Sequence, residues 1–319
     1  MSLHLVLGAG PVGRATASQL AALPDHEVVL ASRSGTGPAI AGVRRIALNA
    51  GDAAALTKAA DGAAVIYNCM NPGNYTKWEA EWPPIYRAMI AAAERTGAVL
   101  AMVSNLYMYD PAVQPLRPNG PEGTPDHKGE LRGRLDREVL EAHEAGRLRA
   151  VIVRASDYLG EGIGQNGMGT RLIEAAAKGK SVQAIGEIDL PHTWTYVPDV
   201  AATVIAAAAK PEALGRIWFA ASNEPRTQRE LLTELLASVG KPMVKISGMP
   251  MWQLTVIGWG VPLMREVKGV SYQFTGPWLY DDSATRTELG VEPTPWAEVL
   301  RETALHNGAG APATAGTPA

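Results

Sequence analysis

Three glycines near the start of the chain have the spacing of a phosphate-binding turn. Gly8, Gly10 and Gly13 form the pattern G-x-G-x-x-G between a short apolar run, residues 3–7, and a segment that can form a helix, residues 11–23. The first glycine allows a tight turn, the second lets a pyrophosphate approach the backbone, and the third permits close packing of helix against strand. The helix N-terminus would offer free N–H groups to the anion. The pattern predicts a dinucleotide site formed by Gly8, Gly10, Pro11, Val12, Gly13 and Arg14.

The residues that follow the second apolar run indicate which dinucleotide binds. A site for NAD usually has an acidic residue about 20 positions after the glycine turn, where it holds the ribose 2′-hydroxyl. This chain instead has Ser32 and Arg33. A guanidinium attracts a 2′-phosphate, and Arg14 could assist it. We therefore predict NADP(H) in preference to NAD(H). The alternative is that Arg33 is a solvated surface residue and that either cofactor binds.

Apolar runs alternate with helical segments over the first half of the chain. The runs lie at residues 3–7, 28–31, 63–67, 99–103 and 151–153, and Ala-rich helical segments such as residues 83–96 and 131–145 separate them. Strands that alternate with helices indicate parallel βαβ units, and such continuous apolar strands need cover on both faces of the sheet. We predict an α/β fold in which residues 1–154 form a Rossmann-type doubly wound parallel sheet.

The pattern becomes looser after residue 154. Thr227 and Glu230 form a capping box that would open a helix. We expect a smaller α+β lobe on the substrate side at residues 155–306, with a segment near 198–209 that returns to the Rossmann domain, and a disordered tail at 307–319. The aromatic residues between 252 and 280 stand at helical spacing and are expected mainly in the core of this lobe.

Composition and charge argue against several classes of protein. The net charge of −3 is small and both signs are spread along the 319 residues, so we expect neither nucleic acid nor a membrane as partner. The single cysteine and the absence of an apolar leader favour a cytoplasmic location. The six histidines show no pair at metal-ligand spacing, so we predict no metal site. The sequence leaves a homodimer open.

Several further segments resemble the short-chain dehydrogenase/reductase superfamily, specifically its extended and atypical members, which are grouped with NAD-dependent epimerases and dehydratases. The resemblance runs over residues 3–305 and includes the pair Gly51-Asp52, the run 65–69, the segment 103–110 and the segment 150–162. It implies that Asp52 holds the adenine amino group and that the strand ending at Asn68 and Cys69 runs under the adenosine. It also implies that Ser104 ends the fifth strand beside the cofactor. Further residues would line the substrate pocket: Asn105, Tyr158, His192 and Trp194.

The resemblance fails at the catalytic triad. Family members that oxidise or reduce a carbinol use a Ser or Thr and then a Tyr-x-x-x-Lys on the following helix. Alignment on the triplet 108–110 puts Asn105 at the hydroxyl position, and alignment on Glu138 puts Glu130 at the tyrosine and Arg134 at the lysine. Neither substitution preserves the chemistry, because a carboxylate titrates far below a phenol and an arginine does not reproduce the point charge of a lysine.

Three functions follow from these residues. The first is an NADPH-dependent reductase that acts on an uncharged small molecule through another acid or base. The candidates for that acid or base are Tyr107, Tyr109, Tyr158, Lys128 and Glu130. Tyr107 is the first choice because it follows the fifth strand directly, and Arg134 on the next helix would then hold the ribose or the substrate. The alternative for Glu130 and Arg134 is an i,i+4 ion pair on a solvated helix face. The second is a non-catalytic protein that senses NADP(H) and regulates a partner. The third is a nucleotide-sugar epimerase or dehydratase, which the missing Tyr and Lys disfavour.

Overall fold

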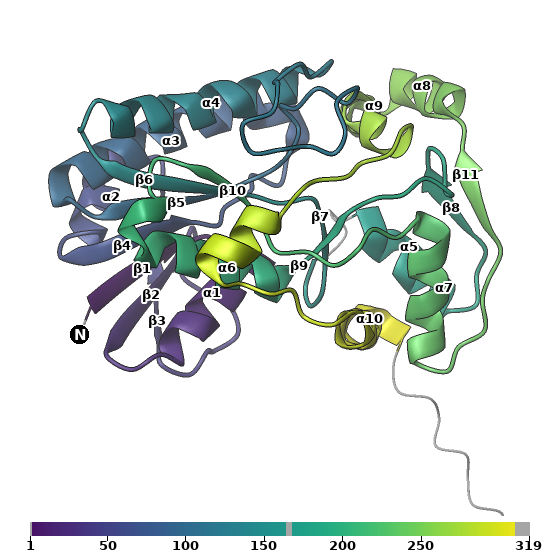
Figure 1. Cartoon of the computed structure of the whole chain (residues 1–319), viewed down its shortest axis with the longest axis horizontal. Coiled ribbons are helices and arrows are strands. Elements are labelled where there is room, and N and C mark those ends of the chain that lie inside the picture. The colour runs from purple at the N-terminus through teal and green to yellow at the C-terminus, as the bar shows by residue number, and fades with distance from the viewer. Residues whose placement is uncertain (1, 164–167, 310–319) are drawn as a thin grey trace, which may run out of the picture. The chain divides into compact units, whose positions relative to one another are not determined.

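The computed structural model describes residues 2–163 and 168–309, which form two compact units (Figure 1). Unit 1 comprises Met1–Ser156, Val197–Ala221 and Tyr280–Glu292, and unit 2 comprises Asp157–Tyr196, Ser222–Leu279 and Pro293–Ala319. The sequence predicted a first boundary at residue 154 and one returning segment near 198–209. The structure adds a second returning segment, residues 280–292, in which the Tyr280 hydroxyl donates to the Ala220 carbonyl at 2.8 Å.

A seven-stranded sheet forms the centre of unit 1. Its order is β10-β6-β5-β4-β1-β2-β3, and every neighbouring pair is parallel. The strands are β1 (Ser2–Leu7), β2 (His26–Ser32), β3 (Val43–Ala47), β4 (Ala63–Asn68), β5 (Val99–Ser104), β6 (Arg149–Arg154) and β10 (Ile217–Phe219). The predicted Rossmann-type parallel sheet is thereby confirmed. Because all strands run in one direction, their carboxyl ends meet at one edge, where such sheets bind ligands.

Helices cover both faces of this sheet. Figure 1 shows α2, α3 and α4 on one face and α1 and α6 on the other, and α1 packs against α6 as α3 does against α4. Their bounds are α1 (Pro11–Ala21), α2 (Ala53–Ala59), α3 (Trp78–Thr96), α4 (His127–Glu144) and α6 (Val197–Ala209). α3 begins five residues before the predicted start at Pro83, and its first turns bury Trp78 and Trp82. The stabilisation from burying these two aromatic rings exceeds the cost of the two helical hydrogen bonds that Pro83 and Pro84, which have no N–H, cannot form.

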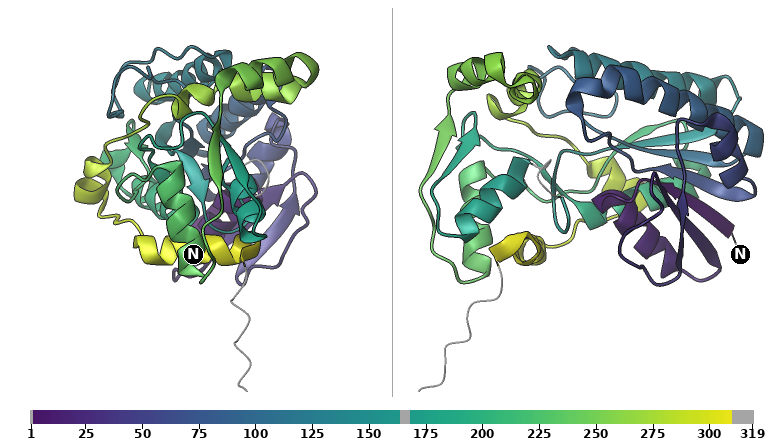
Figure 2. Two further views of the ribbon diagram at one scale, coloured as in Figure 1. Left: turned by 90° about the vertical axis from the view of Figure 1, so that its right-hand side faces the viewer. Right: turned by 180° about the vertical axis from the view of Figure 1, so that it is seen from behind.

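In the part of unit 2 that the structure describes, two short parallel strand pairs combine with five α-helices. β7 (Asp157–Leu159) pairs with β9 (Trp194–Tyr196), and β8 (Val182–Ile185) pairs with β11 (Ile246–Met249). The helices are α5 (Met168–Ala177), α7 (Gln228–Ser238), α8 (Met251–Gly260), α9 (Pro262–Gly269) and α10 (Trp296–Ala304). α8 and α9 lie side by side, as Figures 1 and 2 show. The capping box is confirmed, because the Thr227 hydroxyl accepts the Glu230 N–H at 3.1 Å and the Glu230 carboxylate accepts the Thr227 N–H at 2.8 Å.

Two expectations for unit 2 were wrong. The tail was expected to begin at Asn307, yet this side chain is buried and its amide donates to the carbonyls of Gly160 at 3.0 Å and Thr303 at 2.7 Å. The remainder of the predicted tail, residues 310–319, lies outside the described residues. Trp252 and Trp259 were expected in the core, whereas both are exposed at the surface of α8. Within the described ranges, no helix is long and apolar enough to cross a membrane.

Candidate functional site

The glycine turn joins β1 to α1 at the carboxyl edge of the sheet. Gly8 has a φ of +101°, which L-residues with side chains rarely adopt, and its N–H donates to the Ala31 carbonyl at 2.8 Å. A Cβ atom at Gly13 would lie 1.8 Å from the Gly8 carbonyl oxygen, so only glycine permits this contact of helix and strand. A Cβ atom at Gly10 would meet nothing within 4 Å. The turn is therefore tightly packed on its inner side and open at Gly10.

The first turn of α1 is available to an anion. Gly10 is the N-cap residue of α1, and no side chain caps the helix. Pro11 has no N–H, but the next N–H groups of the first turn have no partner within a helix. The helix dipole adds partial positive charge at this end. The open space at Gly10 and the uncapped helix together fit the pyrophosphate of a dinucleotide.

The end of β2 carries a cation and no carboxylate. Ser32 ends the strand, and its hydroxyl accepts the Gly35 N–H at 3.1 Å. Arg33 follows and is exposed. Its guanidinium forms no hydrogen bond or ion pair with any residue that the structure describes, and no acidic residue occurs between Glu27 and Asp52. A phosphate that reached this point would meet an uncompensated positive charge, helped by Arg14 in the first turn of α1.

Asp52 has a structural role at the start of α2. Its Oδ1 accepts the N–H groups of Ala54 at 3.1 Å and Ala55 at 3.0 Å, so the carboxylate caps the helix. The contact with an adenine amino group stays a prediction.

The end of β4 lies directly beside the glycine turn. The Cys69 N–H donates to the Leu7 carbonyl at 2.9 Å, and a Cβ atom at Gly8 would come within 2.9 Å of the Cys69 carbonyl oxygen. Asn68 is fully buried; its Oδ1 accepts the Met70 N–H at 3.2 Å, while its Nδ2 has no partner among the described residues. Burial raises the pKa of the Cys69 thiol to about 12, so this cysteine is an unreactive core residue.

α4 turns a different set of residues toward the core than the sequence predicted. Its buried charged residues are Lys128, Arg132 and Asp136, which stand four positions apart and are each at most 2% exposed. Glu130 and Arg134 lie on the exposed face, where Arg134 pairs with Glu79 at 3.6 Å. Glu130 and Arg134 thus lie on a solvated helix face, and their assignment to the family's tyrosine and lysine positions stays a prediction.

Lys128 and Arg132 lie on the buried face of α4, each two positions before a predicted residue. The reason for this orientation is steric, since a Cβ atom at Gly129 would lie 2.1 Å from the Tyr107 carbonyl oxygen. This close contact presses the first turn of α4 onto the segment after β5 and fixes which face is buried. Lys128 lies within 3.4 Å of Asp126 Oδ1, so its charge is balanced by the residue that caps the helix.

Asp136 is the centre of a buried polar network at the ends of β5 and β6. Its Oδ2 accepts the Ser104 hydroxyl at 2.9 Å and the Arg154 Nε–H at 3.1 Å, and its Oδ1 accepts the Tyr86 hydroxyl at 3.0 Å. The Ser104 oxygen in turn accepts from Arg132 Nη2 at 2.8 Å. Ser104, predicted as a cofactor contact, thus has its donor and an acceptor site occupied within the protein.

Two arginines belong to this network: Arg154 pairs with Asp136 at 3.0 Å and with Glu122 at 3.4 Å, and Arg132 bonds Ser104. Burial disfavours the charge of Arg154, but Asp136, Tyr109 and Glu122 favour it more strongly, so its pKa is raised. The Arg132 guanidinium lies 4.2 Å from the centre of the Trp82 ring, and its Nε and Nη1 have no hydrogen-bond partner among the described residues. Ring faces hold both cations in the core, and the carboxylates of Asp136 and Glu122 balance the charge of Arg154.

Tyr107 is the half-buried tyrosine that follows β5. Its hydroxyl lies 3.1 Å from that of Tyr75, and its N–H donates to Asn105 Oδ1 at 3.2 Å. Its ring stacks on Trp78 at 6.3 Å. Tyr109 is a poorer acid or base because burial raises its pKa and its hydroxyl donates to the Pro118 carbonyl at 2.9 Å. The hydroxyls of Tyr75 and Tyr107 are therefore better candidates for proton transfer than that of Tyr109, since both tyrosines are half-buried and Tyr109 is buried.

The remaining predicted pocket residues belong to unit 2. His192 is buried, with Nε2 3.0 Å from Asp157 Oδ2 and its ring stacked on Phe274 at 4.8 Å. The Trp194 Nε1–H donates to the Arg226 carbonyl at 2.8 Å. Tyr158 lies half-buried in β7. His192 and Trp194 thus pack and bond within the core of unit 2, and their role toward a substrate stays a prediction.

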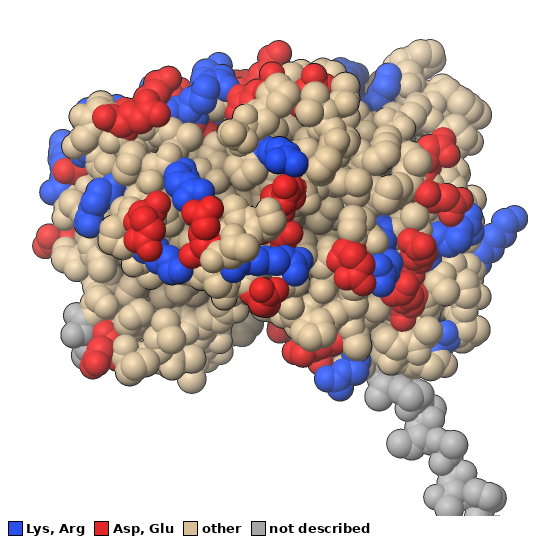
Figure 3. Space-filling view, viewed as in Figure 1, with Lys and Arg blue, Asp and Glu red and all other residues tan. Residues whose placement is uncertain are grey.

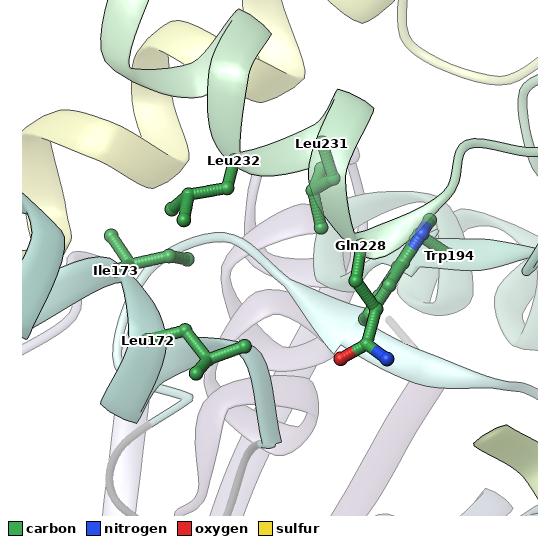
Figure 4. Close-up of a pocket in the computed structure, with 6 residues that line it drawn as sticks. All are labelled: Leu172, Ile173, Trp194, Gln228, Leu231 and Leu232. Carbon is green, nitrogen blue, oxygen red and sulfur yellow. The ribbon is translucent and has the colours of Figure 1, made fainter. Parts of the chain in front are cut away.

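Trp194 also lines a small apolar cavity in unit 2 (Figure 4). Its volume of about 10 Å³ is roughly the minimum for one water molecule, so it is too small for a substrate. Gln228 supplies its polar group, and that amide donates away to the Ile185 carbonyl at 2.9 Å. The six residues that line the cavity are Leu172, Ile173, Trp194, Gln228, Leu231 and Leu232. Among the described residues, no three His, Cys, Asp or Glu side chains come together as a metal site would require.

The sequence analysis missed Arg132, Asp136 and Arg154 of the buried network, and Tyr75, the partner of Tyr107. One signal could have found the first two. Lys128, Arg132 and Asp136 are spaced four residues apart, so they lie on one face of the helix. The apolar residues Leu131 and Leu135 lie beside them on the same face, which indicates that this face is buried. The position of Tyr75 depends on the path of the chain after β4, for which the sequence offers no comparable signal.

Residues 132–220 match the model of the NAD dependent epimerase/dehydratase family. The matched segment begins at Arg132 of α4 and ends just after β10, and over this part of the chain it agrees with the resemblance. No curated protein matches the chain significantly.

Solved structures of similar fold include nucleotide-sugar epimerases. UDP-glucuronic acid 4-epimerase from Bacillus cereus, in complex with NAD, superposes with a TM-score of 0.77 at 16% identity, over 96% of this chain and 98% of that chain. UDP-glucose 4-epimerase from Brucella ovis, also with NAD, gives 0.77 at 17% identity over 97% and 99%. The Thermotoga maritima enzyme with UDP-glucose gives 0.77 at 15% identity over 95% and 98%. These likenesses show the fold alone.

Proposed function

We propose that this chain, which has the fold of the extended short-chain dehydrogenase/reductases and matches the epimerase/dehydratase family over residues 132–220, binds NADP(H) and reduces an uncharged small molecule. The glycine turn supports the dinucleotide, because it is open at Gly10 and ends in an uncapped helix. The observation that carries the choice of NADP(H) is the exposed guanidinium of Arg33, which has no carboxylate partner in the described chain. The buried cations Lys128 and Arg154 are already paired with carboxylates of the protein. Because they have no charge left to balance, they favour an uncharged substrate over an anionic one.

Tyr107 is the proposed proton donor. When bound, NADPH supplies the hydride that reduces a substrate carbonyl at its carbon. Tyr107 donates its phenolic proton to the carbonyl oxygen, which gives the alcohol, and the Tyr75 hydroxyl at 3.1 Å stabilises the phenolate by donating to it. The proton is replaced from solvent, since both tyrosines are partly exposed. Asn105 orients this pair through the Tyr107 N–H.

Replacing Arg33 by Asp is expected to weaken NADPH binding by roughly 10- to 100-fold, which corresponds to the loss of one charge-assisted hydrogen bond. NADH binding should stay equal or improve, because a carboxylate can accept a bond from the ribose 2′-hydroxyl. Isothermal titration with each reduced cofactor measures both affinities. Arg44→Asp on β3 is the matched control, since Arg44 is exposed but pairs with Glu27. Unchanged NADPH affinity in the Arg33 variant would show that Arg33 does not contact the phosphate.

Replacing Tyr107 by Phe is expected to lower kcat by roughly 100-fold or more, as the loss of a general acid does, while NADPH affinity stays nearly unchanged. NADPH consumption over a panel of carbonyl substrates measures the rate. Tyr75→Phe removes only the supporting hydroxyl and should cause a smaller loss. Wild-type turnover in the Tyr107 variant would eliminate Tyr107 as the acid.

A non-catalytic NADP(H) sensor is the second candidate. The observation that favours it is that α4 contains no Tyr-x-x-x-Lys and that its buried cations, Lys128 and Arg132, bond within the protein. A wild-type protein that binds NADPH but consumes none over the carbonyl panel would establish this function in place of the reductase. A nucleotide-sugar epimerase or dehydratase with NAD, as in the solved relatives, is less well supported for the same reason.

A further inference from the structure

The β2–β3 loop, residues 33–42, joins two neighbouring parallel strands without a helix (Figure 1). Parallel strands usually need a crossover of about a dozen or more residues, most often with a helix. Most residues of this loop are exposed, so it buries little side-chain surface of its own. A connection of this kind needs other contacts to keep one conformation. Arg33, the proposed partner of the 2′-phosphate, is the first residue of the loop.

The first turn of the loop is tied to the ends of both strands. The Ser32 carbonyl accepts the N–H groups of Gly35 at 3.3 Å and of Leu48 at 2.8 Å. Gly35 has a φ of +68°, and a Cβ atom there would lie 2.7 Å from the Ala47 backbone nitrogen. Glycine therefore lets the loop rest directly on the backbone at the end of β3.

Arg45 of β3 holds the middle of the loop. Its Nη1 donates to the Thr36 carbonyl at 3.2 Å, and its Nη2 donates to the Pro38 carbonyl. Gly37 stands between these two residues with a φ of +135°, and a Cβ atom there would lie 2.9 Å from Arg45 Nη1. The planar guanidinium thus fits closely against the loop backbone and bridges two of its carbonyls.

The charge of Arg45 is not used in an ion pair. Its neighbour Arg44 pairs with Glu27 at 3.2 Å, and Figure 3 shows basic and acidic side chains next to each other at many points of one face. Arg45 forms no ion pair with any residue that the structure describes, and its Nε is buried without a hydrogen-bond partner there. Within the described chain, every hydrogen bond of this guanidinium therefore goes to the loop that begins at Arg33.

We infer that Arg45 is a positioning residue for the 2′-phosphate of NADP(H). It keeps the β2–β3 loop, and with it Arg33, in one conformation before the cofactor arrives. A loop that is already ordered loses less conformational entropy when the phosphate binds, so NADPH binds more tightly. NADH has no 2′-phosphate and gains little from this order. The inference rests on the proposed function, and it assigns part of the cofactor selectivity to Arg45.

Isothermal titration of Arg45→Met with both reduced cofactors tests the inference. NADPH affinity should fall roughly tenfold, because two hydrogen bonds that order the loop are lost, while NADH affinity should stay within about threefold. Arg45→Lys should lose at least roughly fivefold in NADPH affinity, since lysine keeps the charge but lacks the planar fork. Full NADPH affinity in the lysine variant would overturn the inference, because charge alone would then be enough. Arg44→Met is the matched control and should leave both affinities unchanged.

Two further variants separate positioning from direct contact. Gly37→Ala keeps Arg45 but moves it away from the loop, and it should lower NADPH affinity by a similar factor. In an Arg33→Met background, Arg45→Met should change NADPH affinity by less than about twofold, because Arg45 acts through Arg33. A further loss as large as in the wild-type background would show that Arg45 contacts the phosphate itself and would overturn the positioning role.

Trypsin cleavage after Arg33 measures the order of the loop without any cofactor. Arg45→Met should be cleaved at this bond roughly tenfold faster than the wild type and Arg44→Met, and thermal unfolding shows that the variants stay folded. Equal cleavage rates would overturn the inference. A wild-type preference for NADPH that persists in Arg45→Met would overturn it as well and leave the proposed function standing. Equal wild-type affinities for NADPH and NADH would overturn both, even if the variant were cleaved faster.

Discussion

Replacing Gly10 by Val is expected to abolish binding of both NADPH and NADH and to leave the fold intact. The φ of −73° at Gly10 is accessible to any residue, and a Cβ atom there meets nothing within 4 Å, so the protein itself accommodates the side chain. The same space is where the second glycine of the fingerprint lets a pyrophosphate approach. Isothermal titration measures the affinities, and circular dichroism with thermal unfolding checks the fold.

Two other glycines serve as controls for this experiment. Gly276→Val places the same side chain in equally open space on unit 2 and should leave cofactor binding unchanged. Gly13→Ala should instead destabilise the fold, because its Cβ would lie 1.8 Å from the Gly8 carbonyl oxygen. Retained nucleotide affinity in a folded Gly10 variant would remove the glycine turn from the proposed site.

The second large effect concerns the buried network. Replacing Asp136 by Asn is expected to lower the free energy of unfolding by about 3–5 kcal/mol, the usual cost of breaking a buried ion pair on one side. Arg154 lies 3.0 Å from this carboxylate and is 1% exposed, so it would keep its charge without a fully buried counter-ion. The neighbouring Arg132 would add a second buried cation. Unfolding in urea, followed by circular dichroism, measures the loss.

An exposed ion pair provides the comparison. Glu288→Gln breaks the pair with Arg216, whose side chain is 44% exposed while that of Glu288 is 48% exposed, and should cost less than about 1 kcal/mol. If the Asp136 variant loses no more stability than the Glu288 variant, the network does not hold the ends of β5 and β6 together.

The sheet and the glycine turn could be predicted because their signals are local. A strand buried on both faces needs a continuous apolar run, and Gly13 is required by a contact within the same βα unit. β3 escaped prediction because it is an edge strand with a pattern of half-exposed residues, including Arg44 and Arg45, and so has no apolar run. The second return to unit 1 at residues 280–292 depends on contacts with β10 and α6, which no local pattern indicates.

The register of α4 shows where local reasoning fails. The helix carries charged residues on both faces, so the positions of the charges do not show which face is buried. Lys128 can be buried because Asp126 pairs with it, and Arg132 can be buried because the Trp82 ring and the Ser104 hydroxyl contact its guanidinium. Trp82 and Ser104 come from other elements of the fold. Trp252 and Trp259 were wrongly expected in the core because helical spacing shows only that apolar residues share one face of a helix. It does not show whether that face is buried or exposed.

The most direct test of the account is the affinity of the wild-type chain for the two reduced cofactors, measured by isothermal titration at one ionic strength. The glycine turn predicts that both bind, and the unpaired Arg33 predicts that NADPH binds at least roughly tenfold more tightly than NADH. Equal affinities, or tighter binding of NADH, would contradict the assignment of the site to NADP(H).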